Sequence, residues 1–254
     1  MNRLNDKVAI ITGGNSGVGA ATAKLFADEG AKVVISARRK DKLEEVAREI
    51  EENGGEVLAV SCDISKPEDA ANLVSETLKN FGQIDILVNN AGILEEGLKP
   101  IDRAIDEDIE RIIRTNLEGT MFVTREVTRE MAAAKEGTVV NVASVAGEMG
   151  CGGAAYAASK GGLIALTKHT ALRFSGKGVR ANVVCPGTVV TPMTMNQEAK
   201  NLDPDMFGAM NSHYDLRAGT CTAEDVANII LFLASDESRA MTGQVLISDF
   251  GASL

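Results

Sequence analysis

The chain alternates short apolar runs, rich in β-branched residues, with longer segments of helical character. Most of the runs are almost continuously apolar, as strands are when helices cover both faces of a parallel sheet. The stretches between them are long enough for crossover helices. The pattern predicts an α/β protein with a doubly wound (Rossmann) fold, whose mostly parallel seven-stranded sheet is flanked by helices. The expected strands span 8–12, 32–36, 56–61, 84–89, 138–144, 179–184 and 244–248.

No linker, repeat or low-complexity tract divides these βα units, so we expect one domain over residues 1–254. The longest break runs from about 185 to 221 and has no clean period, which is typical of a functional lid. We place the substrate lid at about 188–220. Helix starts are predicted where a capping oxygen precedes an acid by three residues, and Asp225 makes the weakest such pair. The three pairs are Asp41 with Glu44, Ser65 with Glu68, and Thr222 with Asp225.

The charge balance narrows the range of partners. With 26 Lys and Arg against 36 Asp and Glu, the net charge is −10, which disfavours nucleic acid and anionic membranes. The four cysteines show no CxxC spacing, and neither a secretory signal nor a membrane span is recognisable. We therefore expect a cytoplasmic protein. Two isolated histidines give no support for a histidine-based metal site, and we expect none.

A glycine-rich turn directly follows the first expected strand. Its residues are Gly13, Asn15, Ser16, Gly17, Val18 and Gly19, and a helical pattern comes next. Glycines at such a turn let the backbone approach a pyrophosphate, whose charge is met by free N–H groups at the start of the helix. The alternative is a tight turn that binds nothing.

The spacing TGxxxGxG resembles the cofactor turn of the classical short-chain dehydrogenases/reductases. Further motifs of that family follow in order, and the resemblance covers essentially the whole chain. They are Asn89-Asn90-Ala91-Gly92 after the fourth strand, Ser144 at the end of the fifth, Tyr156-x-x-x-Lys160 at the start of a helix, and Pro186-Gly187 after the sixth strand.

Tyr156 and Lys160 are four residues apart, so a helix places them on one face. An ammonium close to the phenol is expected to lower the tyrosine pKa from its usual value near ~10, which would let Tyr156 exchange a proton at neutral pH. The resemblance implies that Ser144 orients the substrate oxygen and that Lys160 also holds the nicotinamide ribose. It implies that Asn116 helps to hold a water that links the lysine to solvent. For Asn116, a local hydrogen bond within its helix is an equal alternative.

The chain departs from the family pattern between Ser144 and Tyr156. Their separation of 12 positions is one short of the usual spacing, because the glycine-rich loop 147–153 is shorter. That loop borders the substrate in the family. The shape of the substrate pocket is therefore open.

Cofactor preference depends on the end of the second strand, where an acid favours NAD and a base favours NADP. No acid stands at Ala37, and Arg38 and Arg39 follow it. A guanidinium there can bind a 2′-phosphate, so we favour NADP(H), with NAD(H) as the alternative. The less favoured alternative is that the arginines form a solvated basic cluster, because Ser16 lacks the basic side chain of many NADP-preferring relatives.

The resemblance implies further cofactor contacts. Asp63 and Ile64 would contact the adenine, and Asn90, Ala91 and Gly92 would pass under the adenosine ribose. The nicotinamide would be walled by Pro186, Gly187, Val189 and Thr191.

The expected lid is rich in methionine, with Met193, Met195, Met206 and Met210. Such adaptable apolar side chains suggest a hydrophobic substrate, such as a hydroxysteroid or bile acid, although packing of the lid on its own scaffold explains them equally well. We expect an oxidoreductase that interconverts a secondary alcohol and a ketone. The alternatives are a 3-oxoacyl thioester reductase, a sugar or polyol dehydrogenase, and a non-catalytic dinucleotide sensor. The resemblance also implies a homotetramer. Substrate, stereochemistry and physiological direction stay open.

Overall fold

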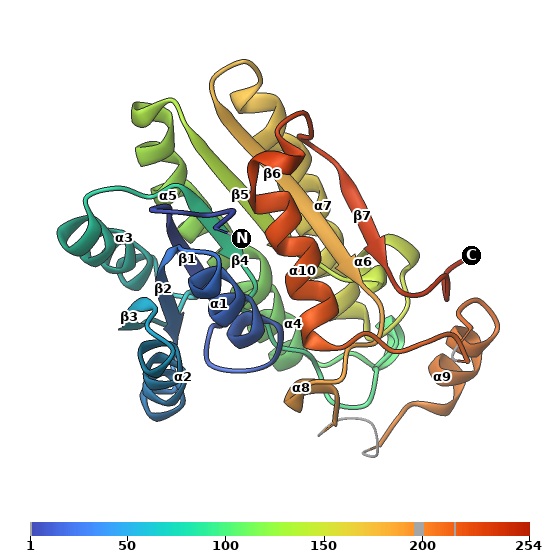
Figure 1. Ribbon diagram of the computed structural model, residues 1–254. Helices are drawn as coiled ribbons and strands as arrows, with labels where there is room; N and C mark the ends of the chain where they lie inside the picture. The colour runs from blue at the N-terminus through green and yellow to red at the C-terminus, as the bar shows by residue number, and fades with distance from the viewer. Residues whose placement is uncertain (1, 196–200, 216) are drawn as a thin grey trace.

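The structure is a computed structural model that describes residues 2–195, 201–215 and 217–254. Its centre is a seven-stranded sheet in the order β3-β2-β1-β4-β5-β6-β7, in which every neighbouring pair is parallel (Figure 1). The predicted fold class is confirmed. The strands are β1 (Val8–Thr12), β2 (Lys32–Ala37), β3 (Glu56–Ser61), β4 (Ile86–Asn89), β5 (Gly137–Val142), β6 (Val179–Pro186) and β7 (Val245–Ser248).

The strand ends agree with the sequence prediction to within two residues. The largest differences are at β4, which begins at Ile86, at β5, which ends at Val142, and at β6, which continues to Pro186. As a result, Ser144 stands two residues beyond its strand, whereas Pro186 lies inside one.

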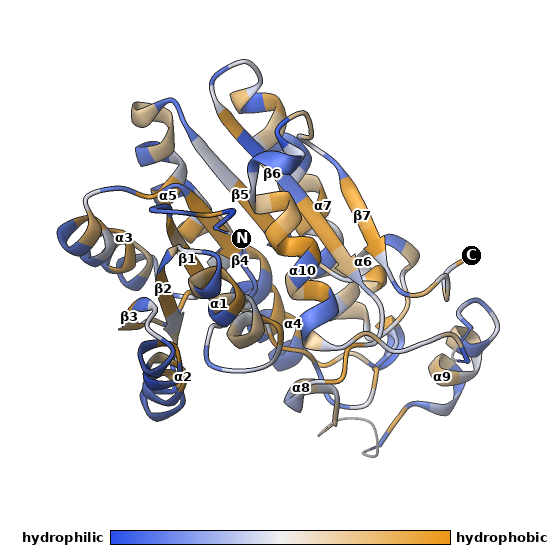
Figure 2. Ribbon diagram, in the orientation of Figure 1, coloured by the Kyte–Doolittle hydropathy of each residue, from blue (hydrophilic) through white to orange (hydrophobic). Residues whose placement is uncertain are grey.

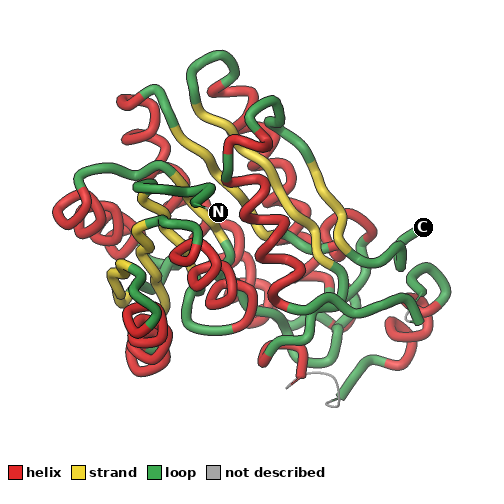
Figure 3. The backbone as a smooth tube through the Cα atoms, viewed as in Figure 1, coloured by secondary structure: helices red, strands yellow, loops and turns green. Residues whose placement is uncertain are grey.

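Crossover helices connect the strands (Figure 3). They are α1 (Gly17–Asp28), α2 (Lys40–Glu52), α3 (Pro67–Phe81), α4 (Asp106–Ile112), the π-helix η2 (Ile113–Gly119), α5 (Thr120–Ala134), α7 (Ala154–Phe174) and α10 (Ala223–Ala234). Shorter elements lie in the loops: η1 (Ile101–Arg103), α6 (Val145–Met149), α8 (Pro192–Met195), α9 (Pro204–Asn211) and η3 (Asp236–Ser238). Both α8 and α9 belong to the expected lid, of which residues 196–200 and 216 lie outside the described residues.

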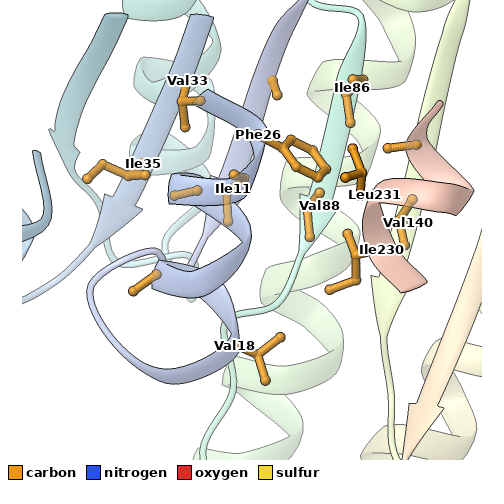
Figure 4. Close-up of a cluster of buried hydrophobic side chains, with 14 of the residues drawn as sticks. Ile11, Val18, Phe26, Val33, Ile35, Ile86, Val88, Val140, Ile230 and Leu231 are labelled. Atoms are coloured by element: carbon orange, nitrogen blue, oxygen red, sulfur yellow. The ribbon is translucent and has the colours of Figure 1, made fainter. Parts of the chain in front are cut away.

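Two hydrophobic layers explain why the strand sequences are continuously apolar. Along β1, Ala9 and Ile11 join a core cluster with α1, α2 and α10, while Val8 and Ile10 join a cluster with α3, α5 and α7 on the opposite face. Figure 4 shows Ile11 in the first of these clusters together with Phe26 of α1 and Ile230 of α10. Figure 2 shows the strands largely apolar and α2 mostly hydrophilic.

Two of the three predicted helix caps are wrong. The helix α2 begins at Lys40 after Arg39, so Asp41 lies within its first turn, and α3 begins at Pro67 after Lys66. The Ser65 hydroxyl donates instead to Asp63 Oδ1, at 2.7 Å. Only Thr222 and Asp225 form the reciprocal capping box, at the start of α10. In α3 the proline supplies the start signal, because its missing N–H costs nothing in the first turn of a helix.

Candidate active site

A crevice of about 540 Å³ opens at the carboxyl ends of the strands. The strand order reverses between β1 and β4, and ligands of doubly wound proteins bind at such a switch point. The crevice brings together nearly all the site residues predicted from the sequence; of these, Gly19 and Asn116 are not among the residues that line it. The predicted residues that line it are Gly13, Asn15, Ser16, Gly17, Val18, Arg38, Arg39, Asp63, Ile64, Asn90, Ala91, Gly92, Ser144, Tyr156, Lys160, Pro186, Gly187, Val189 and Thr191.

The glycine-rich turn packs closely on its surroundings. A Cβ atom at Gly19 would lie 2.3 Å from the Gly13 carbonyl oxygen and 2.5 Å from Asn90 Nδ2, so no larger residue fits there without a shift. Asn90 Nδ2 donates to the carbonyl oxygens of Thr12 and Gly13, at 3.1 and 3.3 Å. The turn is therefore held in place by the loop that follows β4.

The N-terminus of α1 is suited to an anion. Its N-cap residue, Ser16, makes no side-chain capping bond, and the first turn contains no acidic residue. The first-turn N–H groups and the positive end of the helix dipole therefore lack a negative partner from this helix. Ser16 and Gly17 line the crevice, which is the arrangement that a bound phosphate group requires.

The two arginines after β2 have different surroundings. With its amide oxygen facing the guanidinium, Asn15 accepts from Arg39 at 3.0 and 3.2 Å. Arg38 is exposed and lies near Asp63. Burial acts to raise the pKa of Asp63, but hydrogen bonds from Ser65 and the charge of Arg38 outweigh it and lower this pKa. Both arginines thus line the crevice, with Arg39 hydrogen-bonded to Asn15 of the glycine turn and Arg38 beside Asp63.

Tyr156 and Lys160 project from the first two turns of α7, as their spacing predicts. Lys160 is 4% exposed, and its Nζ donates to the Val142 carbonyl oxygen at 2.9 Å and lies 5.5 Å from the centroid of the Tyr156 ring. Burial lowers the pKa of Lys160 to about 8. The lysine is thus both buried and able to release a proton near neutral pH.

The sequence predicts that Lys160 lowers the pKa of Tyr156, and this prediction is wrong. Burial raises the pKa of Tyr156 to about 12, although a hydrogen bond with Ser144 opposes the rise, and the charge of Glu95 adds to it. Removal from water disfavours both phenolate and ammonium. The lysine therefore does not stabilise the phenolate enough to offset the burial of the phenol.

Ser144 is the N-cap of α6, where its Oγ accepts from the Ala146 N–H at 3.1 Å. The Ser144 hydroxyl can therefore still donate its proton to another acceptor. A hydrogen bond with Tyr156 brings the two hydroxyl groups together in the crevice. The loop between them, although one residue shorter than usual, still brings Ser144 to Tyr156. Gly150 and Gly152 close this loop in left-handed conformations, at φ of 73° and 90°.

Asn116 lies in the π-helix η2, and its side chain is fully buried. Its Oδ1 accepts from the Ile93 N–H and its Nδ2 donates to the Ile93 carbonyl oxygen, both at 2.8 Å. A second donation goes to Ser159 Oγ, at 3.0 Å. The side chain thus bridges to other segments, so the alternative of a local helix bond is wrong. Wide π-turns are frequent at functional sites.

Some site contacts gave no clear signal in the sequence. The Thr12 hydroxyl accepts from the N–H groups of Asn90 and Ala91, both at 3.1 Å, and so joins β1 to the loop after β4. Glu95, in the same loop, is buried against the start of α7. Only the unusual Glu95-Glu96 pair after the Asn-Ala-Gly motif could have drawn attention to it.

The lid is joined to that loop. Arg103 pairs with Asp203 and Asp205, and the Asp203 N–H donates to the Gly97 carbonyl oxygen at 2.8 Å. Asp203 also caps α9. On the other side, the Met210 sulfur accepts from the Gly152 N–H at 3.3 Å. The described part of the expected lid therefore contacts both loops beside Tyr156.

The sheet order and the glycine-lined crevice define a doubly wound, Rossmann-type protein. The family model for short chain dehydrogenases matches residues 7–202. The chain is 38% identical over 250 residues to a 3-oxoacyl-(acyl-carrier-protein) reductase of Thermotoga maritima, covering 98% of both chains. It is 34% identical to a 7alpha-hydroxysteroid dehydrogenase of Bacteroides fragilis, covering 100% of this chain and 97% of that one. The solved structure of levodione reductase superimposes with a TM-score of 0.90 at 33% identity, covering 98% of both chains.

The chain belongs to the short-chain dehydrogenase family. It is therefore an oxidoreductase that acts on CH–OH groups of a small-molecule substrate, in a family that uses NAD(H) or NADP(H). Within residues 2–195, 201–215 and 217–254, no helix has the length and apolar character that a membrane crossing requires.

Proposed function

We propose that the protein interconverts a hydrophobic secondary alcohol and its ketone with NADP(H). The observation that carries this proposal is the meeting of Ser144, Tyr156 and Lys160 at the carboxyl ends of the strands, in a crevice that also contains an uncapped helix N-terminus. A binding module has no need of a hydroxyl pair beside a buried lysine.

The residues of the crevice fit a dinucleotide. Gly19 leaves no space for a Cβ atom, and the first turn of α1 presents free N–H groups toward a pyrophosphate. Arg38 would bind the 2′-phosphate of NADP(H), while Arg39 is held on Asn15. Pro186, Gly187 and Thr191 would line the nicotinamide end. When bound, the cofactor supplies or accepts the hydride.

The proton chemistry follows from the residues around Tyr156. With a pKa of about 12 the phenol is protonated at neutral pH, so it can donate to a carbonyl oxygen and thereby favours ketone reduction. The Ser144 hydroxyl would donate a second hydrogen bond to the same oxygen as negative charge develops there. Lys160, whose pKa is about 8, would return the proton to Tyr156. Asn116 would hold the loop at Ile93 beneath this path and retain a water there.

Apolar side chains at the mouth of the crevice support a hydrophobic substrate. Met193 lines the crevice, and Val190, Met195 and Phe207, which belong to the expected lid, are also exposed although apolar. A steroid-like ketone would cover them. The similarity to a named hydroxysteroid dehydrogenase is consistent with this class of substrate. We propose in addition that the chain acts as one domain and that residues 188–220 close over the substrate.

A 3-oxoacyl thioester reductase is the second candidate, because curated relatives from three distinct bacteria carry that activity in their names at 36–38% identity. A carrier-bound substrate would call for free basic side chains at the mouth. Arg111 lines the crevice but is paired with Asp108, and Arg103, which contacts the expected lid, is paired with Asp203. We therefore rank the small hydrophobic ketone first.

The test follows NADPH absorbance with purified protein and a panel of oxo-steroids, acetoacetyl thioesters, ketoses and simple ketones. Turnover of the oxo-steroids is the expected result, and Tyr156→Phe should lower it by orders of magnitude while NADPH still binds. Turnover of the thioesters alone would favour the second candidate, and turnover of the ketoses alone would favour a sugar or polyol dehydrogenase. No turnover across the panel, despite NADPH binding, would favour the non-catalytic sensor. Faster turnover with NADH would reverse the cofactor proposal.

We also propose a cytoplasmic homotetramer. Large apolar side chains are exposed near the C-terminal end of the chain and on α7, namely Leu172 of α7, Ile247 of β7 and Phe250 just beyond β7. A second copy would cover them. Light scattering of the purified protein should give four times the monomer mass, and a monomer would contradict this arrangement.

A further inference from the structure

Glu95 is a buried carboxylate without a cation. It is 3% exposed and lies in the loop between β4 and η1. The other buried acids of the described residues have strong partners, since Glu29 pairs with Arg3 at 2.7 Å and Asp249 accepts from the N–H groups of Gly251 and Ser253, both at 2.9 Å. Within the described ranges, Glu95 has no ion pair, and its Oε2 has no hydrogen-bond partner. Burying a carboxylate without a cation opposes folding.

The carboxylate faces the start of the helix that bears Tyr156. Its Oε1 lies 3.5 Å from the Tyr156 backbone N, and Tyr156 is the third residue of α7. The N-cap residue Gly153 makes no side-chain capping bond, and the first turn contains no acidic residue. Glu95 therefore supplies, from a distant segment, the negative charge that helix N-termini normally obtain from their own sequence.

Gly153 makes room for this contact. A Cβ atom at Gly153 would lie 1.6 Å from Glu95 Oε1, so the carboxylate occupies the space that any other N-cap residue would fill. The same loop also fixes the first residue of the helix, because the Ala154 N–H donates to the Lys99 carbonyl oxygen at 3.0 Å. The loop after β4 thus holds the first turn of α7 at two points.

We propose that Glu95 is a positioning residue for Tyr156. From the loop after β4, Glu95 caps the first turn of α7 and directs its negative charge at the tyrosine. This inference rests on the proposed role of Tyr156 as the acid. The other charged groups around Glu95 are Asp108 and Arg111 of α4, whose effects on it are opposite, and Lys99, which pairs with Asp108 at 2.8 Å. Asp108 and Arg111 are also paired with each other, at 2.9 Å.

The charge has a direct chemical consequence. An anion at this position favours the neutral phenol over the phenolate, and the charge of Glu95 raises the pKa of Tyr156 in addition to the effect of burial. At the alkaline pH at which Tyr156 ionises, Glu95 is itself ionised even though burial raises its pKa. Glu95 therefore disfavours the phenolate form of Tyr156.

The titration of Tyr156 can be measured without substrate or cofactor. The chain has two tyrosines and no tryptophan, so the tyrosinate absorbance of a protein minus that of its Tyr156→Phe counterpart isolates one phenol. Rapid pH jumps in a stopped-flow instrument record this absorbance before the protein unfolds. Glu95→Gln keeps the size and an acceptor oxygen but removes the charge, and it should lower the midpoint of Tyr156 by about one pH unit.

Glu96→Gln is the matched control. Glu96 is the next residue, is exposed, and accepts from Asn201 Nδ2, which glutamine can still do. This variant should leave the midpoint unchanged. Gly153→Ala provides an independent perturbation, because its Cβ displaces the carboxylate, and it should shift the midpoint in the same direction as Glu95→Gln. In turnover, Glu95→Gln should lower kcat by about tenfold and leave the Kd of NADPH unchanged.

An unchanged Tyr156 midpoint in Glu95→Gln would overturn the proposal, as would an equal shift in Glu96→Gln. A merely structural cap would alter thermal stability without a shift of this midpoint. Because the readout needs no catalysis, it stays valid even if the panel of ketones shows no turnover. Failure of the proposed function and failure of this inference are therefore separate results.

Discussion

Lys160 is expected to lower the stability of the folded protein at neutral pH. Its ammonium is buried, and within the described residues no carboxylate pairs with it; its one hydrogen bond goes to the Val142 carbonyl oxygen. Burial lowers its pKa from 10.5 to about 8. A group that is harder to protonate in the folded chain than in the unfolded one opposes folding wherever the unfolded chain carries the proton. Lys160→Met removes this penalty and keeps a side chain of similar length.

The size of the effect follows from the shift. A change of roughly 2.5 pKa units corresponds to about 3 kcal/mol at pH 7, where the unfolded lysine is fully protonated. The variant also removes the partner of the Val142 carbonyl oxygen, which costs about 1 kcal/mol. Lys160→Met should therefore stabilise the protein by about 2 kcal/mol at pH 7, or roughly 4–8 °C in Tm.

The gain depends on pH in a defined direction. Below the folded pKa of about 8 the penalty is fully present, and it disappears as the pH rises through the unfolded value of 10.5. At pH 10 about 1 kcal/mol of penalty is left, which the unpaired Val142 carbonyl cancels. The advantage of Lys160→Met should therefore fall from about 2 kcal/mol at pH 7 to nearly zero at pH 10.

Urea unfolding followed by circular dichroism at both pH values tests this reasoning. Lys168→Met is the control, because Lys168 lies exposed on the same helix and should change stability little at either pH. If Lys160→Met is less stable than the wild type at pH 7, the buried ammonium does not destabilise the folded protein. If its advantage is equal at pH 7 and pH 10, the gain has a cause other than the buried charge.

Four further variants test the cofactor turn and the helix caps. Arg38→Ala should weaken NADPH binding roughly tenfold in a fluorescence titration but change NADH binding less than about twofold, since only NADPH carries the 2′-phosphate, and equal losses would contradict the assignment. Gly19→Ala should weaken both cofactors by roughly tenfold in the same titration, because its Cβ would lie 2.3 Å from the Gly13 carbonyl oxygen; unchanged affinity would show that the turn adapts. Thr222→Ala should lower Tm by about 2–4 °C through loss of its capping box, whereas Ser65→Ala, at a predicted cap that does not form, should change Tm much less; the reverse order would refute the cap geometry.

The strands could be predicted closely because each depends on one property, the continuous apolar run that two helix layers require. The helix starts were harder, because a cap depends on where the chain turns. At Asp41 and Ser65 the right residues are present, but the helices begin elsewhere. The residues around a helix start do not determine the direction from which the preceding loop enters the helix, so the cap position could not be predicted from them.

The candidate site shows the same division. Its residues could be placed in the crevice from motif order, because parallel strands all end at one edge of the sheet. The pKa of Tyr156 could not be predicted, since it depends on burial and on Glu95, which lies 61 positions earlier in the chain. Likewise, the hydrogen bonds between Asn116 and Ile93 span 23 positions and depend on the π-helix η2, which no residue spacing in the sequence predicts.

That π-helix also governs the helical phase of the long segment that runs from α4 through η2 to α5. In an α-helix each residue advances by about 100°, so an extra residue would rotate everything beyond it away from the core. The π-turn absorbs such a residue locally, and Ile112 before it and Val123 after it are both fully buried. Deleting one residue within η2 would restore regular α-helix and rotate Asn116 away from Ile93 while both flanking segments could still pack. The amide that supports the crevice therefore depends on a single surplus residue in the helix.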